Sequence, residues 1–91
     1  MGGSETAELG DAARRRRLKF RCWHRGMKEV DLILGRFADA AVDGMDERSL
    51  AAFEALLDDP DPQILAWVTG QESVPADRDT EFLRRLMAFH R

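Results

Sequence analysis

The chain has 91 residues, of which 44% are hydrophobic and 34% are charged, the balance of one folded domain rather than of a disordered tail. A domain of this size holds one hydrophobic core and leaves little room for a deep active site. No apolar run approaches the roughly 20 residues that span a bilayer, and the N-terminus resembles neither a secretory signal nor a mitochondrial transit peptide. Cys22 is the single cysteine, so no internal disulfide can form. We therefore expect a cytoplasmic protein without membrane insertion.

The net charge of −3 conceals a strong asymmetry along the chain. Residues 14–28 hold eight basic side chains and no acidic one, whereas residues 29–91 hold fourteen acidic and six basic side chains. Such a split indicates that the basic segment either meets an anionic partner or organises the acidic remainder.

The first predicted helix ends shortly before Gly26. Residues 1–13 lack periodicity and are predicted to form a disordered leader. A first helix is predicted from about Ala12 or Arg14 to His24. Its broad apolar side consists of Leu18, Phe20, Cys22 and Trp23. Because glycine inside a helix costs about 1 kcal/mol relative to alanine, we expect a turn at Gly26.

The second helix has the clearest periodicity, and Gly44 is suited to its left-handed C-terminal cap. Its apolar residues recur at intervals of three and four: Met27, Val30, Ile33, Leu34, Phe37, Ala38, Ala41 and Met45.

Three shorter helices complete the predicted fold. Asp46 is expected to cap the third helix, and Asp61 before Pro62 predicts the start of a fourth helix that Gly70 ends. The fifth helix is predicted to begin at Asp77 or Asp79. The apolar residues assigned to these helices are Leu50, Phe53, Leu56, Leu57, Ile64, Leu65, Trp67, Val68, Phe82, Leu83, Leu86 and Phe89. No segment has the pattern of a strand, so the sequence predicts an all-α, single-domain five-helix bundle over residues 14–91.

The sequence contains no recognisable catalytic or metal-binding constellation. On a helix, Cys22 and His24 point about 200° apart and cannot form a nucleophile–base pair, and His90 lies at the end of the chain. Zinc needs about four ligands, which one cysteine, two distant histidines and scattered carboxylates do not supply. No glycine-rich phosphate loop is present either. We expect no catalytic residue, no metal and no stably bound cofactor. A redox role for Cys22 would need a depressed thiol pKa, and packing in a half-buried position is the favoured interpretation.

The run of four arginines at residues 14–17 suggests a second kind of function. A basic helix can neutralise phosphates, so a small nucleic-acid-binding or regulatory module is the alternative hypothesis. The overall pI of about 5.3 and the lack of a recognition helix argue against it. Steering of an acidic protein partner is the favoured interpretation of this run.

The segment from Arg25 to Glu29 is the most distinctive one in the chain. Arg25 and Glu29, four residues apart, could form an ordinary surface ion pair that contributes a few tenths of a kcal/mol. Gly26 lies between them, and a missing side chain lets another backbone approach closely. Arginine is also well suited to engage carboxylates or carbonyls across an interface. We therefore expect this segment to be a contact surface.

Here the sequence resembles a known family. Residues 24–31, His-Arg-Gly-Met-Lys-Glu-Val-Asp, resemble the R-G-x-x-E signature of the SdhE-type succinate dehydrogenase assembly factors, or flavinylation factors. The basic lead-in at residues 17–21, the second helix with its phenylalanine, the segment Asp59–Trp67 and Pro75 before the last helix follow in the order of that family. The likeness covers residues 14–90.

The resemblance implies a five-helix chaperone, not an enzyme, in the bacterial cytoplasm. Members of the family promote covalent attachment of FAD to the flavoprotein subunit of succinate dehydrogenase, and in bacteria also of fumarate reductase. FAD is then the group attached to the partner, and this chain holds none stably. Carried onto this sequence, the signature places Arg25, Gly26 and Glu29 at the partner contact, with His24, Lys28 and Asp31 as flanking candidates. We expect a monomer that binds no nucleic acid.

Overall fold

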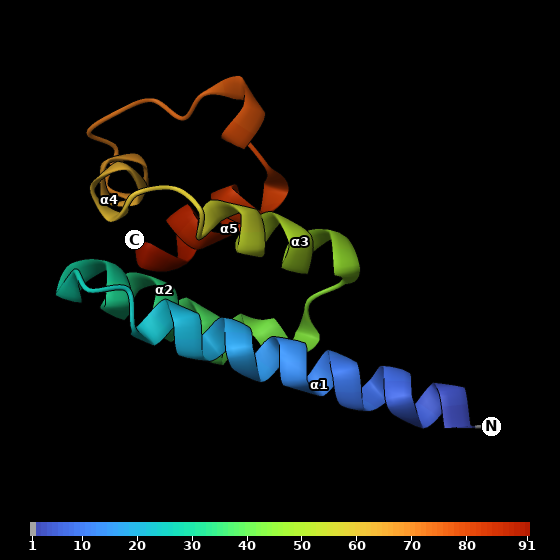
Figure 1. Cartoon of the computed structure of the whole chain (residues 1–91). Helices are drawn as coiled ribbons and strands as arrows, with labels where there is room; N and C mark the ends of the chain where they lie inside the picture. Colours follow the sequence, from blue (N-terminus) through green and yellow to red (C-terminus); the bar gives the residue numbers. More distant parts are fainter. Residues whose placement is uncertain (1) are drawn as a thin grey trace.

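The computed structural model describes the backbone of residues 2–91 and the side chains of residues 10–91. Over this range the chain forms five α-helices and two short 3-10 helices, and no strand. In chain order they are α1 (Gly2–Trp23), α2 (Lys28–Ala41), η1 (Val42–Gly44), α3 (Glu47–Leu56), α4 (Asp61–Val68), η2 (Ala76–Arg78) and α5 (Glu81–His90). α1 and α2 lie side by side, α3 and α5 pack together above them, and α4 lies at one end (Figure 1). The predicted all-α five-helix bundle is confirmed.

One hydrophobic core joins all five helices. Its side chains come from the apolar positions that recur every three or four residues, as expected for helices packed on one face. The fully buried large members are Leu18, Cys22, Val30, Leu34, Val42, Leu50, Phe53, Ile64, Leu83 and Leu86. Phe37 packs edge-on against Phe53 and Phe82, with ring centroids 5.8 and 5.9 Å away. This aromatic cluster connects α2 with α3 and α5.

The close contact between α1 and α2 depends on a glycine. A Cβ atom added to Gly35 would lie only 2.3–2.7 Å from three carbons of the Trp23 indole. The indole therefore occupies the space above Gly35, and its Nε1 donates a hydrogen bond to the Asp39 carboxylate at 3.2 Å. Trp23 is the last residue of α1, so this contact places the turn that follows it.

The beginning of α1 differs from the sequence expectation. The helix starts at Gly2, so the predicted start at Ala12 or Arg14 is wrong; the backbone of residues 2–13, expected as a leader, is helical, and residue 1 lies outside the described part. Alanine, glutamate and leucine in this stretch favour a helix. The Arg15 guanidinium also donates to the Asp11 carboxylate one turn earlier, at 2.8 Å. The N-terminal half of α1 extends beyond the other helices (Figure 1).

The helix ends confirm some predictions and correct others. Asp46 caps α3 by accepting a hydrogen bond from the Ser49 backbone at 2.8 Å, and Gly70 follows α4 with a φ of +81°, both as predicted. Gly44 is not a left-handed cap, because its φ is not positive and the chain passes into η1 instead. Pro60 precedes α4 and Asp61 is its first residue, so the helix begins one position earlier than predicted from Asp61 as the cap and Pro62 as the first helical residue. Thr80, rather than an aspartate, caps α5.

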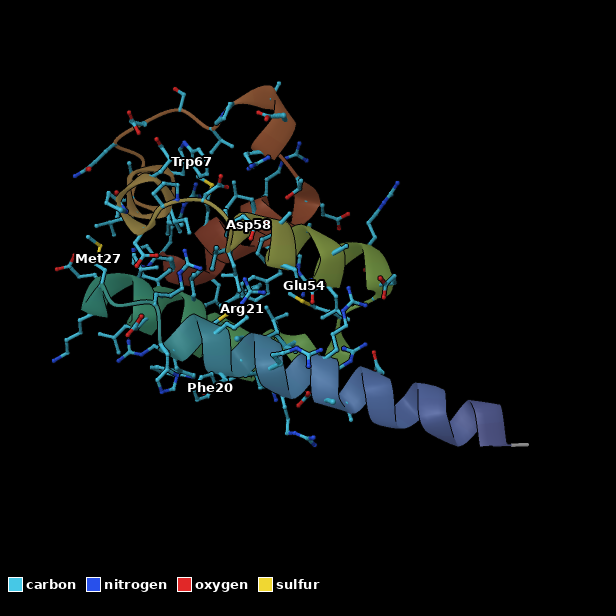
Figure 2. The ribbon with its side chains drawn as sticks, in the orientation of Figure 1. Phe20, Arg21, Met27, Glu54, Asp58 and Trp67 are labelled. Atoms are coloured by element: carbon cyan, nitrogen blue, oxygen red, sulfur yellow. The ribbon has the colours of Figure 1, made fainter. Side chains whose placement is uncertain are left out.

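Two aromatic side chains predicted to point inward are exposed. Phe20 is 63% exposed and Phe89 is 51% exposed. Phe20 lies on the side of α1 that faces away from α3, while Arg21 points toward α3 (Figure 2). The apolar stripe of α1 is therefore narrower than the sequence pattern suggested, and Leu18 and Cys22 are its buried members.

Candidate partner-binding surface

Arg25 is anchored inside the protein. Its Nε donates to a carboxylate oxygen of Asp61 at 2.8 Å, and its two terminal nitrogens donate to the backbone carbonyls of Leu57 at 2.5 Å and Asp59 at 2.8 Å. Only 14% of each side chain in the Arg25–Asp61 pair is exposed. The rigid guanidinium fork thus ties the α1–α2 turn to the turn between α3 and α4.

This arrangement differs from an i, i+4 ion pair of Arg25 and Glu29 on one helix face, which their spacing suggested. α2 begins at Lys28, so Arg25 precedes the helix and makes no ion pair with Glu29. Because all three of its donating nitrogens are used within the chain, Arg25 shapes the turn rather than reaching outward. The sequence predicted only a helix-capping role for Asp61 and gave no sign of its ion pair with Arg25.

The turn itself has a defined conformation. Gly26 has a φ of +109°, a region that side-chain-bearing residues rarely adopt. A Cβ added there would meet no atom within 4 Å, so the backbone conformation, and not crowding, requires glycine. Asp31 accepts a hydrogen bond from the Arg25 backbone at 2.8 Å. Like Arg25, Asp31 therefore stabilises the turn from within.

A second arginine reinforces the same anchor. Arg78 donates through two nitrogens to the Asp59 carboxylate, at 2.7 and 3.0 Å, and this pair raises the pKa of Arg78. Asp59 consequently binds Arg78 through its side chain and Arg25 through its carbonyl. No sequence motif indicated this link, because Arg78 lies nineteen residues after Asp59.

The remaining candidates face outward. His24, Lys28 and Glu29 are exposed, and none of them forms an ion pair with the described side chains. The His24 ring stacks on the exposed Phe20 ring, with centroids 4.0 Å apart. His24 Nδ1 also lies 2.7 Å from the Phe20 carbonyl oxygen. The predicted residues thus divide into an internal pair, Arg25 and Asp31, and an exposed group around Gly26.

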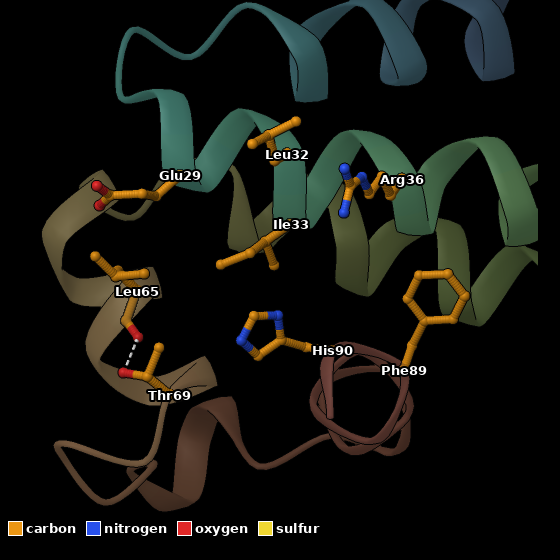
Figure 3. Close-up of a pocket in the computed structure, with 8 residues that line it drawn as sticks. All are labelled: Glu29, Leu32, Ile33, Arg36, Leu65, Thr69, Phe89 and His90. Atoms are coloured by element: carbon orange, nitrogen blue, oxygen red, sulfur yellow. Dashed lines mark hydrogen bonds between the residues drawn. The ribbon is translucent and has the colours of Figure 1, made fainter.

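Glu29 also lies at the edge of a groove of about 470 Å³ between α2, α4 and the end of α5 (Figure 3). The groove has a mainly apolar lining with charged or polar groups at its edges. Its lining residues are Glu29, Leu32, Ile33, Arg36, Leu65, Thr69, Phe89 and His90. Sequence reasoning missed this groove because its residues come from three separate helices.

The basic run on α1 is partly neutralised within the chain. Arg14 binds the carboxylates of Glu47 and Glu54, each at 2.5 Å, which raises the pKa of Arg14 and lowers that of Glu54. Arg15 donates to the backbone carbonyl of Val42, the first residue of η1, and to that of Met45, the residue after η1. Residues 16–17 are exposed. The acidic remainder is therefore organised in part by the basic segment, one of the two outcomes expected from the charge asymmetry.

Cys22 is completely buried rather than half-buried. Burial raises the pKa of its thiol to about 12, the direction opposite to that of a reactive cysteine. The structure therefore favours packing over the redox role considered from the sequence.

Other site classes find no support in the described residues. No group of three or more His, Cys, Asp or Glu side chains among them is placed to hold a metal ion. None of the described helices combines the length and the apolarity needed to cross a membrane.

Comparison with known proteins identifies the family. A family model described as the flavinator of succinate dehydrogenase matches residues 16–90. The chain belongs to this family. It is 43% identical to a FAD assembly factor SdhE from Acetobacter pasteurianus, over 92% of this chain and 77% of that protein. It is 40% identical to the factor of the same name from Legionella pneumophila, over 68% of this chain and 77% of that protein.

A eukaryotic protein is also similar. The mitochondrial succinate dehydrogenase assembly factor 2 of Dictyostelium discoideum is 37% identical over 77% of this chain, which spans half of that protein's length. No solved structure matches the chain. The flavinator family match begins at residue 16, so Arg14 and Arg15 lie outside it, whereas the Arg25 anchor, the Gly26 turn and every residue that lines the groove lie within it.

Proposed function

We propose that this protein promotes the covalent attachment of FAD to the flavoprotein subunit of succinate dehydrogenase. The observation that carries the proposal is the family match over residues 16–90, together with relatives that are named FAD assembly factors. In this proposal the protein acts in the bacterial cytoplasm as a monomeric chaperone and not as an enzyme. FAD becomes bonded to the partner, and this chain holds no cofactor of its own. The fumarate reductase flavoprotein is a second proposed client.

The proposed contact surface consists of the exposed residues around the turn: His24, Gly26, Lys28 and Glu29. Arg25 and Asp31 support this surface from within through their hydrogen bonds. A turn that is already ordered loses little conformational entropy on binding, so more of the contact energy appears as affinity. Lys28 and Glu29 are free to make charge-assisted hydrogen bonds with the partner.

The proposed mechanism is stabilisation of a minor conformation of the flavoprotein. Binding that favours the state in which FAD and its acceptor side chain are in register raises the rate without any acid or base from this protein. Holding two reacting groups in the correct geometry can lower a barrier by several kcal/mol. A nucleic-acid partner is not part of the proposal, because Arg14 and Arg15 bind acceptors within the chain.

The experiment measures covalent flavin in cells that lack their own assembly factor. Flavin fluorescence of the denatured flavoprotein subunit is recorded with the wild-type protein, with Glu29→Lys and with Glu81→Lys as the control. Both glutamates are exposed and lie in the first turn of a helix, but Glu81 is on α5. We expect wild type and Glu81→Lys to restore the signal, and Glu29→Lys to bind the purified apo-flavoprotein at least about tenfold more weakly, the equivalent of 1.4 kcal/mol.

The experiment tests the proposed function and the proposed contact surface separately. If the wild-type protein fails to restore covalent flavin, the proposed function is wrong. If Glu29→Lys binds and restores as well as Glu81→Lys does, the function stands and the proposed surface is wrong.

A further inference from the structure

The groove beside Glu29 has the character of a binding site for a polypeptide segment. Leu32, Ile33 and Leu65 are only partly buried, and Phe89 is half exposed. These side chains come from α2, α4 and α5 and face a common space (Figure 3). An apolar hollow of about 470 Å³ on such a small domain holds a few side chains of a partner.

Charges of opposite sign lie at its two ends. Glu29 and Arg36 are both on α2 and occupy opposite ends of the groove in Figure 3. They are seven residues apart, which is about 10 Å along a helix axis. Both are exposed, and neither forms an ion pair with the side chains described.

We propose that this groove receives a segment of the flavoprotein with an apolar centre and two oppositely charged side chains about 10 Å apart. The inference rests on the proposed function. The segment's basic residue meets Glu29 and its acidic residue meets Arg36. That spacing corresponds to positions i and i+7 of a helix, which lie on the same face.

Two features favour the flavoprotein as the occupant. Glu29 belongs both to the proposed contact surface and to the groove, so a partner bound at the turn continues directly onto the apolar floor. The order of the charges along α2, acidic and then basic, also gives the segment a direction, because the opposite orientation would place like charges together. Such charge patterns determine register and specificity more than raw affinity.

The test is site-specific photo-crosslinking of the full-length protein to the purified apo-flavoprotein subunit. The photoreactive amino acid p-benzoylphenylalanine replaces Arg36 in one variant, Lys28 in a second and Arg48 in a third. Arg48 is an exposed arginine on α3, outside the groove, and is the matched control. We expect adducts from positions 36 and 28 but none from position 48. Mass spectrometry of the position-36 adduct should identify one flavoprotein peptide with the predicted charge spacing.

A charge-reversal experiment then tests the orientation. Arg36→Glu should weaken flavoprotein binding about tenfold, and changing the acidic residue of the crosslinked segment to lysine should recover most of that loss. A flavoprotein adduct from position 28 with none from position 36 overturns the groove proposal and leaves the proposed function intact. An adduct between two copies of this chain also overturns it, because the groove would then be a self-interface. No flavoprotein adduct from either position, with no gain of covalent flavin in cells, overturns both.

Discussion

Replacing Arg25 by lysine separates an anchoring role from a contact role. Lysine keeps the positive charge but cannot match the fork that reaches Asp61 and the carbonyls of Leu57 and Asp59 together. If one of the three hydrogen bonds survives, two are lost. Hydrogen bonds to a charged group are worth about 1.5–3 kcal/mol each, and the low end applies because 14% of the side chain meets water.

The expected loss of stability for Arg25→Lys is therefore about 3 kcal/mol. That is a large share of the roughly 5–10 kcal/mol that stabilises a domain of this size, and it lowers Tm by roughly 12–24 °C. Urea unfolding followed by circular dichroism measures the loss directly. Lys28→Met, at an exposed neighbour, should stay within about 0.5 kcal/mol of wild type.

A double-mutant cycle makes the reasoning refutable. Arg25→Lys combined with Asp61→Asn should destabilise by less than the two single changes added together, because the partners interact. If Arg25→Lys unfolds at the same urea concentration as wild type and the cycle shows no coupling, the internal anchor is wrong. Loss of flavoprotein binding by that stable variant would then assign Arg25 to the interface itself.

Three further predictions follow from packing and charge. Gly35→Ala should destabilise by about 1–3 kcal/mol in thermal unfolding, because the new methyl group collides with the Trp23 indole; an unchanged Tm would contradict the close helix contact. Cys22, buried and with its thiol pKa raised to about 12, should react with a thiol reagent at pH 8 only as fast as the protein opens; rapid labelling of the native protein would contradict the burial. The pKa of Glu54 is lower in the folded protein than in the unfolded chain, so the ionised carboxylate stabilises the fold at any pH above its unfolded pKa. This contribution is lost as the pH falls below about 4. Acid titration of Arg14→Met, which lacks the guanidinium responsible, should show a smaller loss than wild type, and an equal loss would refute this cause.

Much of the fold could be predicted from local patterns. The buried residues of α2, α3 and α4 follow the three-and-four periodicity, and Asp46 and Gly70 act where their chemistry indicated. These features depend on residues within one or two helical turns. Periodicity alone did not separate the buried Cys22 from the exposed Phe20, because both belong to the broad apolar side of α1.

The parts that could not be predicted depend on residues far apart in the sequence. Asp61 is 36 residues from Arg25, and no local spacing relates them. The Trp23–Gly35 contact likewise became visible only once α1 and α2 were placed side by side. Without these contacts, the spacing of Arg25 and Glu29 suggests an ordinary i, i+4 helix pair, whereas Arg25 precedes α2 and binds Asp61.

The structure places Arg25 and Glu29, the two charged residues of the segment that resembles the family signature, in different environments. Arg25 faces inward and binds the α3–α4 turn, so in the proposed function its effect on the partner passes through the shape of the Gly26 turn. Glu29 faces outward at the edge of the groove, where a partner can reach it. A change at Arg25 should therefore lower stability and affinity together, whereas a change at Glu29 should lower affinity alone. Two such different profiles within five residues would show that the signature combines a structural anchor with a contact residue.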